Sequence, residues 1–234
     1  MKRQISLLLS TVLFAHSANT LADQPFRSAK KKLVKAYQQH PNATTFYCGC
    51  SINWVGKKGI PDASSCGYTP RRQITKKGNP NQRAGRVEWE HVVPAYWFGS
   101  QLQCWQSGGR KNCKKDPQFR KMEGDMHNLR PAIGELNGDR SNYRFSMIEG
   151  EPRLYGHCDF EVSFKSKKAE PPEEKRGDIA RTYFYMADRY GLNLSSQQQQ
   201  LFNAWSNSDP VDTWEHERNS MIERIQGNSN HFIN

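Results

Sequence analysis

Six cysteines restrict the folds open to this 234-residue chain more than any other feature of its sequence. They are Cys48, Cys50, Cys66, Cys104, Cys113 and Cys158. In an oxidising compartment, six cysteines can form three disulfide bonds in several alternative pairings. Cys104 and Cys113 flank a Gly-Gly pair and are expected to form a local bridge. Cys158 is then expected to reach back to Cys48 or Cys50.

A structural zinc site is the alternative use of these cysteines. Paired zinc ligands are usually separated by roughly two to four residues. Only one residue separates Cys48 from Cys50, and no cysteine has a second one at Cys-X-X-Cys spacing. The spacing therefore favours disulfides over zinc.

The first 22 residues have the pattern of a secretory signal peptide. Lys2 and Arg3 precede an apolar run over 5–15, and Thr20-Leu21-Ala22 provides small residues for cleavage after Ala22. An N-terminal anchor is the alternative, but the run is shorter than the roughly 20 residues that a spanning helix needs. We expect residues 23–234 to form one exported domain, either periplasmic or extracellular.

The net charge of +11 is concentrated in two segments. Eight basic residues and one acidic residue, Asp62, lie between Lys57 and Arg86, and a second basic cluster spans 110–121. Such stripes attract polyanions. Charge alone does not identify nucleic acid as the partner, because many exported cationic proteins bind none.

The spacing of apolar residues predicts a mixed α+β fold of helices and short strands. Helices are expected over 24–40, 95–105 and 131–136, and in the last third over 178–190, from Ser195 or Ser196, and from Asp209-Pro210 to Ile225. A strand is expected over 87–93 and an extended segment over 126–129. Residues 107–121 are expected to form a polar loop, and 165–176 a surface connection.

The densest group of chemically active side chains lies in Glu88-Trp-Glu-His91 and in the segments 123–131 and 135–142. Phosphodiester hydrolysis needs a base for water and a positive charge near the phosphoryl oxygens. A neutral imidazole such as His91 provides the base, and a hard cation held by oxygen ligands provides the charge. Adjacent residues on a regular strand face opposite sides, so Glu90 and His91 can share a site only if the strand ends or bends there.

Several strings resemble bacterial endonuclease I, a family of periplasmic or secreted nucleases with a ββα-metal (His-Me finger) active site. They run in order over nearly all of the chain after the leader. They are Phe46-Tyr-Cys-Gly-Cys50, Glu88-Trp-Glu-His-Val-Val-Pro-Ala95, Cys104-Trp-Gln-Ser-Gly-Gly-Arg-Lys-Asn-Cys113, Met126-His-Asn-Leu129, Asn137-Gly-Asp-Arg-Ser-Asn142 and Ala180-Arg-Thr-Tyr-Phe-Tyr185.

The resemblance implies a small bent antiparallel sheet surrounded by helices, held by the disulfides, and a role for each matching residue. His91 corresponds to the general base, and Glu90 and Asn137 correspond to ligands of a single Mg²⁺, for which Mn²⁺ or Ca²⁺ can substitute. Arg110 corresponds to an arginine that stabilises the phosphate, and Glu123 to an acidic residue near the site.

His127 and Asn128 are rival candidates for the histidine and asparagine positions, and we interpret them as structural. The resemblance further implies a monomer that cleaves DNA, and also RNA, with little sequence preference. The expected products carry 5′-phosphate and 3′-hydroxyl ends.

One departure from the family and two other functions remain to be weighed. Relatives often have a cysteine after the late Trp-Glu pair, where this chain has His216, so a looser tail is expected.

A DNA-capture protein with a decayed site is one alternative, although Glu90, His91, Asn137 and Arg110 are all retained. An envelope-targeting protein is the other, and it explains the charge but none of the motifs.

Overall fold

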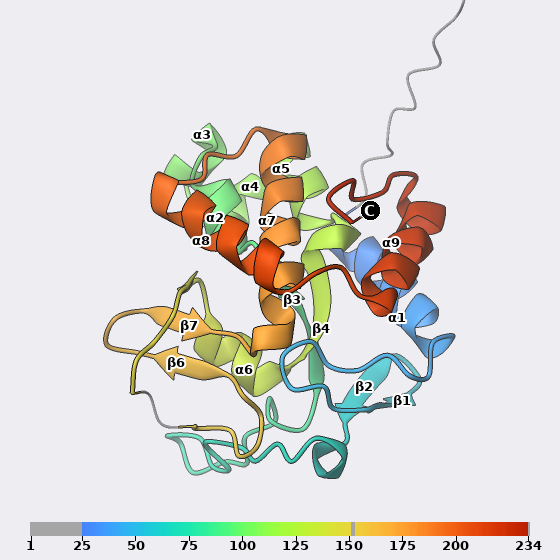
Figure 1. Ribbon diagram of the computed structural model, residues 1–234, viewed down its shortest axis with the longest axis vertical. Coiled ribbons are helices and arrows are strands. Elements are labelled where there is room, and N and C mark those ends of the chain that lie inside the picture. Colours follow the sequence, from blue (N-terminus) through green and yellow to red (C-terminus); the bar gives the residue numbers. More distant parts are fainter. Residues whose placement is uncertain (1–24, 151–152, 234) are drawn as a thin grey trace, which may run out of the picture.

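The computed structural model of the chain describes residues 25–150 and 153–233 (Figure 1). The predicted leader and its cleavage after Ala22 lie outside the described residues. Within these ranges, no helix combines the length and the apolar character that crossing a membrane requires.

The described segments form a mixed α/β structure of mostly short elements. The helices are α1 (Phe26–Gln38), α2 (Ala95–Gly99), α3 (Gln103–Gln106), α4 (Gly109–Cys113), α5 (Pro117–Glu123), α6 (Gly134–Arg140), α7 (Arg176–Tyr190), α8 (Ser196–Ser208) and α9 (Thr213–Gln226). The strands are β1 (Ile52–Val55), β2 (Lys58–Pro61), β3 (Val87–His91), β4 (Leu129–Ile133), β5 (Arg144–Phe145), β6 (Glu161–Ser163) and β7 (Lys168–Glu170). Single 3₁₀ turns occupy Ala63–Ser65, Met126–Asn128 and Glu173–Lys175.

The strands form three small sheets in the described chain, where a single bent antiparallel sheet was expected. The β1–β2 hairpin and the β3–β4 pair are both antiparallel, with Val87 opposite Ile133 and His91 opposite Leu129. In the third sheet β7 pairs antiparallel with β6 but parallel with β5. Because each of these sheets has few strands, the helices packed around them supply most of the burial.

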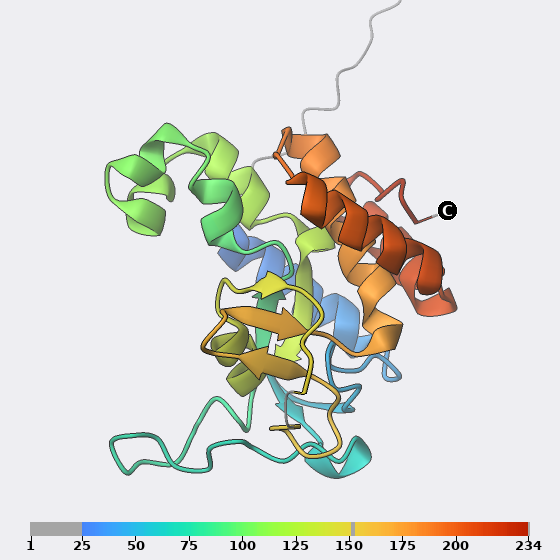
Figure 2. The same cartoon turned by 60° about the vertical axis from the view of Figure 1, so that its left-hand side comes forward.

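The helices gather in two places around the β3–β4 pair. Figure 2 shows α2 to α5, in green, as a lobe of short helices, with α7 and α8 packed against one another beside it. At the opposite end, the teal loop that precedes β3 projects from the body (Figure 2). Helix α6 follows β4 directly, so β3, β4 and α6 form a strand–strand–helix unit.

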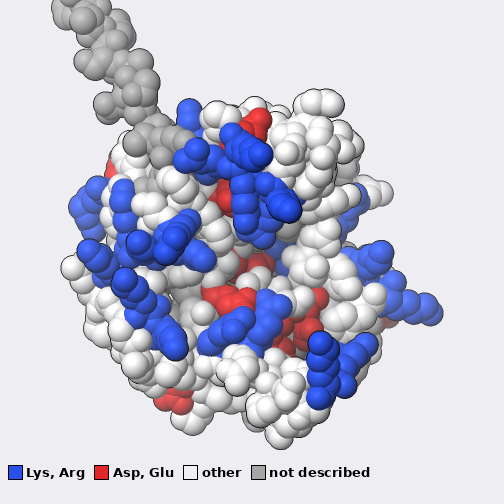
Figure 3. Space-filling view, turned by 180° about the vertical axis from the view of Figure 1, so that it is seen from behind, with Lys and Arg blue, Asp and Glu red and all other residues white. Residues whose placement is uncertain are grey.

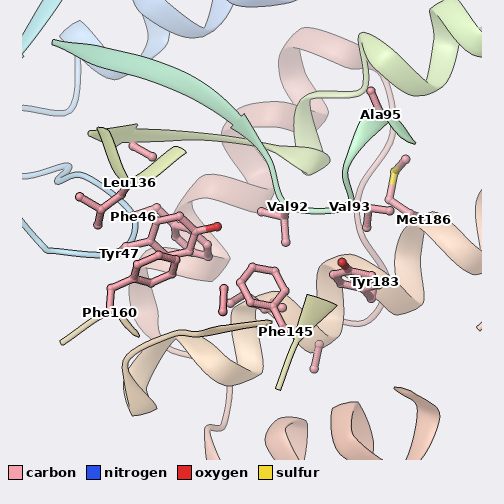
Figure 4. Close-up of a cluster of buried hydrophobic side chains, with 14 of the residues drawn as sticks. Phe46, Tyr47, Val92, Val93, Ala95, Leu136, Phe145, Phe160, Tyr183 and Met186 are labelled. Atoms are coloured by element: carbon pink, nitrogen blue, oxygen red, sulfur yellow. The ribbon is translucent and has the colours of Figure 1, made fainter. Parts of the chain in front are cut away.

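The residues that follow β3 are anchored in the main hydrophobic core. Val92 and Val93 are buried against aromatic side chains that include Tyr47, Phe145 and Tyr183 (Figure 4). Burying a valine side chain contributes roughly 1.5–3 kcal/mol. The end of β3 is therefore held in one position.

Three disulfides fasten the loops, as expected from the export pattern. The predicted local bridge, Cys104–Cys113, is present, and Cys158 pairs with Cys48 rather than with Cys50. Cys50 pairs with Cys66. All six cysteines lie in the described residues and none is free.

Two expected elements were wrong. Residues 107–121 were expected to be a loop, but α4 and most of α5 lie there, and Asp116 caps α5 by accepting a hydrogen bond from the Phe119 amide. Pro131 was expected to open a helix, but it is the central residue of β4, and α6 begins at Gly134. The first error overlooked the Asp116 cap and the local Cys104–Cys113 bridge, whereas the second arose because long-range pairing with β3 decided the conformation of the proline.

Four smaller differences concern boundaries. The predicted helix over 95–105 is divided into α2 and α3, and β7 lies within the expected connection over 165–176. The expected extended segment over 126–129 is a 3₁₀ turn that leads into β4. Ser195 caps α8, as predicted, in a capping box with Gln198, and Gly227 ends α9 in the left-handed region. The start predicted for the last helix at Asp209-Pro210 was wrong, because α9 begins at Thr213 and Asp212 is its N-cap.

Candidate active site

Strand β3 presents its side chains alternately to two helices. The side chains of Glu88 and Glu90 contact α6, because Glu88 accepts a hydrogen bond from Asn137 and Glu90 pairs with Arg140. On the other face, the Trp89 ring lies 5.3 Å from Tyr37, and the His91 ring 4.7 Å from Phe26, both on α1. The alternation expected of a regular strand is thus maintained up to its last residue.

Both faces of β3 nevertheless border a single pocket of about 540 Å³. Every residue from Arg86 to His91 lines it, because in the described chain β3 pairs with β4 along one edge and the pocket passes around the other. Of the residues proposed from sequence, the pocket brings together Glu90, His91, Arg110 and Asn137. Figure 3 shows a hollow with acidic side chains at its centre and Lys and Arg on both sides.

His91 is fixed through one ring nitrogen. Its Nε2 lies 2.9 Å from the backbone carbonyl oxygen of Glu123. A carbonyl oxygen only accepts, so Nε2 carries the hydrogen and Nδ1 retains its lone pair. Burial lowers the pKa of His91 to about 3, against the opposing effect of that carbonyl, and the charges of Arg110 and Lys30 lower it further. The imidazole is therefore neutral, and able to accept a proton, at neutral pH.

Glu90 is almost completely buried, with 2% of its surface exposed. Tyr47 donates a hydrogen bond to Oε1 at 2.9 Å, and the Arg140 guanidinium donates another at 2.8 Å. Burial raises the pKa of Glu90 above its usual value, although Arg140 and Tyr47 oppose that effect. Within the described chain both hydrogen bonds end on Oε1, which leaves Oε2 without a hydrogen-bond partner.

Arg140 connects Glu90 to the end of the strand. Its guanidinium is fully buried and also donates to the backbone carbonyls of His91 and Val92, at 2.9 and 2.7 Å. One α6 side chain thus fixes the Glu90 carboxylate and the backbone of the predicted base together. Arg140 and Tyr47 were not predicted as site residues. They lie 50 and 43 positions from Glu90 in the chain, so local spacing gives no sign of these contacts.

Glu88, which was not predicted as a site residue, lies on the same face of β3 as Glu90 and holds a second group of polar side chains at the pocket. It accepts hydrogen bonds from Arg83, Arg86 and Asn137. Although burial raises the pKa of Glu88, the two arginines outweigh it and hold the pKa below its usual value. Its two-residue spacing from Glu90 was the signal available in the sequence, since positions i and i+2 share a strand face.

Asn137 donates through Nδ2 to Glu88 at 2.8 Å, so its Oδ1 is turned away from that carboxylate. The next helix position, Gly138, lies against Arg83: a Cβ there would be 2.2 Å from an Arg83 Nη atom. The glycine therefore allows Arg83 to pack on α6 and reach Glu88.

Arg110 and Glu123 form a pair at the rim. Arg110 Nε lies 2.8 Å from Glu123 Oε1, and the arginine side chain is 45% exposed while the carboxylate is buried. Glu123 does not line the pocket, but it contacts two residues that do: His91 through its backbone and Arg110 through its side chain. Arg110 also lies over the Phe26 ring at 5.9 Å, so the rim residue and the His91 stacking partner are in contact.

His127 and Asn128 lie away from the pocket lining. Asn128 forms a reciprocal pair of hydrogen bonds with the Val93 backbone, and His127 Nε2 lies 2.9 Å from the carbonyl oxygen of Asn228. These contacts favour the interpretation of both residues as structural.

The donor set suits a hard cation that retains water. The described residues contain no group of three or more His, Cys, Asp or Glu side chains arranged for a metal. Glu90 Oε2 and Asn137 Oδ1 are oxygen donors that border the same pocket. Mg²⁺ commonly takes one or two protein oxygens and keeps several waters, whereas structural zinc needs four N or S ligands. The residues present therefore fit Mg²⁺ and do not fit zinc.

Comparison with known proteins identifies the family. The sequence profile of the family described as "Endonuclease I" matches residues 25–234. The chain belongs to the endonuclease I family. It is 56% identical to a "Periplasmic deoxyribonuclease" of Aeromonas hydrophila over 98% of this chain and 91% of that protein. An "Extracellular deoxyribonuclease" of the same species is 54% identical over 98% and 94% of the two chains. Endonuclease I proteins are generally metal-dependent nucleases.

A more distant relative covers only part of the chain. It is an "Extracellular ribonuclease" of Bacillus amyloliquefaciens, 34% identical over 47% of this chain and 43% of its own length. The two deoxyribonucleases, one named as periplasmic and the other as extracellular, resemble this chain at nearly equal identity.

Proposed function

We propose that this chain is an endonuclease that hydrolyses phosphodiester bonds in DNA, and also in RNA, with His91 as the general base. The observation that carries the proposal is the 2.9 Å contact between His91 Nε2 and the Glu123 carbonyl oxygen, which requires Nε2 to carry the hydrogen and leaves the Nδ1 lone pair to take a proton. The attacking water gives its proton to Nδ1 as its oxygen bonds to phosphorus. The 3′ oxygen then leaves and is protonated by solvent, which yields 3′-hydroxyl and 5′-phosphate ends.

We assign β3, β4 and α6 to a ββα-metal (His-Me finger) core with one Mg²⁺ held by Glu90 and Asn137. When bound, the ion supplies positive charge to the phosphoryl and leaving oxygens. The chain's own part is to orient the two donors: Tyr47 and Arg140 hold Glu90, and Glu88 holds the Asn137 amide. Mn²⁺ or Ca²⁺, as other oxygen-preferring cations, can occupy the same donors.

Arg110 is placed to neutralise the phosphate as its charge increases. Its guanidinium is half exposed at the pocket rim and is anchored by Glu123, so it needs little reorganisation to meet an anion. Glu123 acts on both His91 and Arg110, through a backbone and a side-chain contact, and is a positioning residue in this scheme.

The substrate is bound mainly through its phosphates. Arg83 and Arg86 border the catalytic pocket, and further basic residues lie along the loop that precedes β3. Phosphate contacts fix the position of a duplex without reading its sequence, which accounts for low sequence preference. Because two relatives are named as a periplasmic and an extracellular deoxyribonuclease, we place the mature chain, residues 23–234 after cleavage at Ala22, in the periplasm or the medium. We further propose that it acts as a monomer.

Cleavage of supercoiled plasmid by the oxidised mature protein tests the proposal. The assay compares wild type with His91→Ala in Mg²⁺ and in EDTA, and the matched control is His216→Ala, because His216 is exposed on α9. Wild type and His216→Ala are expected to cut only with metal, and His91→Ala is expected to shift the plasmid on a gel without cutting it. Normal cutting by His91→Ala would show that the base has been assigned wrongly. A wild-type protein that binds but never cuts would favour the DNA-capture alternative.

A further inference from the structure

A second hollow adjoins the catalytic pocket. It has a volume of about 1030 Å³ and lies between α2, the β5–β7 sheet and the first half of α8. In Figure 1 these elements lie together, with α2 and α8 above the β6–β7 hairpin. The two hollows share a rim, because Ala95 and Ser141 line the catalytic pocket while their neighbours Tyr96 and Asn142 line the second one. We call the second hollow the Trp97 groove.

The Trp97 groove offers flat surfaces for stacking. The Arg144 guanidinium lies over the Trp97 ring at 4.7 Å from its centroid, and the indole is fixed by donating to the backbone carbonyl of Asn142 at 3.0 Å. Tyr96 is 49% exposed, although an aromatic ring of this size is usually more buried. Aromatic rings and guanidinium planes are the surfaces on which unpaired bases stack.

The charge of the groove has one sign. Arg144, Lys167 and Lys168 are exposed and line it, and its lining in the described chain includes no Asp or Glu. The remaining polar side chains are amides and hydroxyls, such as the exposed Gln197, whose amide can both donate to and accept from base edges. Cations together with aromatic rings and amides match a single-stranded nucleic acid, whose phosphates and bases alternate along the strand.

We propose that the Trp97 groove binds a few unpaired nucleotides next to the phosphate being cut, with bases stacked on Tyr96 and on the Arg144–Trp97 pair. The inference builds on the proposed nuclease function. Because Ala95 and Ser141 on one side adjoin Tyr96 and Asn142 on the other, a strand whose phosphate occupies the catalytic pocket can reach the groove within a short span of nucleotides. The chain therefore binds a frayed or single-stranded segment more tightly than phosphate contacts alone allow.

The test compares two oligonucleotides of equal length and charge, one of thymidines and one with abasic sites in their place. Their affinities for the oxidised mature protein are measured in EDTA by fluorescence anisotropy, so no cleavage is needed. Stacking typically contributes about 1–3 kcal/mol per base, so wild type should bind the thymidine strand at least about fivefold more tightly. Trp97→Ala should abolish this difference, and Arg144→Gln should reduce it.

Two controls separate stacking from charge and from misfolding. Arg224→Gln removes the same charge from an exposed site on α9, on the far side of the molecule in Figures 1 and 2, and should leave the difference unchanged. Arg144 is exposed, so its variant keeps the core intact if Trp97→Ala does not fold. Equal binding of both oligonucleotides by wild type, or a full difference retained in Arg144→Gln, would overturn the proposal. Failure of wild type to cut plasmid in Mg²⁺ would instead refute the nuclease function.

Discussion

The buried hydrogen bond from Tyr47 to Glu90 gives the most direct prediction from this structure. Tyr47→Phe removes one hydroxyl and keeps the ring, which packs 4.3 Å from Phe160 and 5.0 Å from Phe46, measured between centroids. The acceptor is a carboxylate with 2% exposure, and hydrogen bonds to charged groups contribute about 1.5–3 kcal/mol. Arg140 still holds Glu90 in the variant, so we expect a loss of about 2 kcal/mol rather than unfolding.

Urea unfolding of the oxidised protein, followed by tryptophan fluorescence, measures this loss. With a slope of roughly 1–3 kcal/mol per M, the midpoint should fall by about 1 M. Tyr96→Phe is the matched control, because the Tyr96 ring is half exposed and its variant should stay within about 0.5 kcal/mol of wild type.

A double-mutant cycle with Glu90→Gln isolates the pair itself. Contacting residues that share a hydrogen bond should show a coupling of about 0.5 kcal/mol or more. If Tyr47→Phe is as stable as wild type and the coupling is zero, the hydroxyl does not support the Glu90 carboxylate, and our account of how that side chain is held is wrong.

Three further predictions concern stability. Burial lowers the pKa of His127 to about 4, so between pH 4 and about 6.5 this residue binds fewer protons in the folded chain than in the unfolded one. Stability should rise with pH across that window, with His127 contributing up to about 1.4 kcal/mol per unit and His91, whose pKa is also lowered, adding to the slope in the same direction. His127→Gln should reduce the slope measured by urea unfolding by up to about 1.4 kcal/mol per unit, whereas His216→Gln should leave it unchanged. Glu215→Ala leaves the buried Arg181 guanidinium without its carboxylate and should cost about 3–5 kcal/mol by thermal or urea unfolding; a loss below 1 kcal/mol would contradict this. Replacing Cys48 and Cys158 by serine opens a bridge that spans 110 residues, and it should lower the free energy of unfolding by about 5 kcal/mol. Replacing Cys104 and Cys113, which are nine residues apart, should lower it by about 3 kcal/mol. The reverse order of urea midpoints would refute this argument from chain entropy.

Local physics explains which parts of the fold were predictable. The apolar spacing of α1, the Ser195 capping box and the left-handed Gly227 are determined within a few residues, and the sequence predicted all three segments. The prediction of a loop over 107–121 was wrong. Its glycines and lysines suggest a loop, but the Cys104–Cys113 bridge and the Asp116 cap stabilise short helices there. The helix predicted to start at Pro131 was wrong, because pairing between β3 and β4 outweighed the preference of proline for a helix start.

The sequence by itself supplied the candidates for the site, which are a Glu-His pair at 90 and 91, the asparagine at 137 and the arginine at 110, together with six cysteines suited to disulfides. Only the tertiary structure decided how they are used. It placed Glu90 and His91 on opposite faces of β3 and brought a pocket around the strand edge to reach both. It also committed His91 Nε2 and Glu90 Oε1 to fixed partners, the Glu123 carbonyl, Tyr47 and Arg140. These contacts join residues 32 to 50 positions apart, and such pairings depend on how the whole chain packs rather than on local spacing.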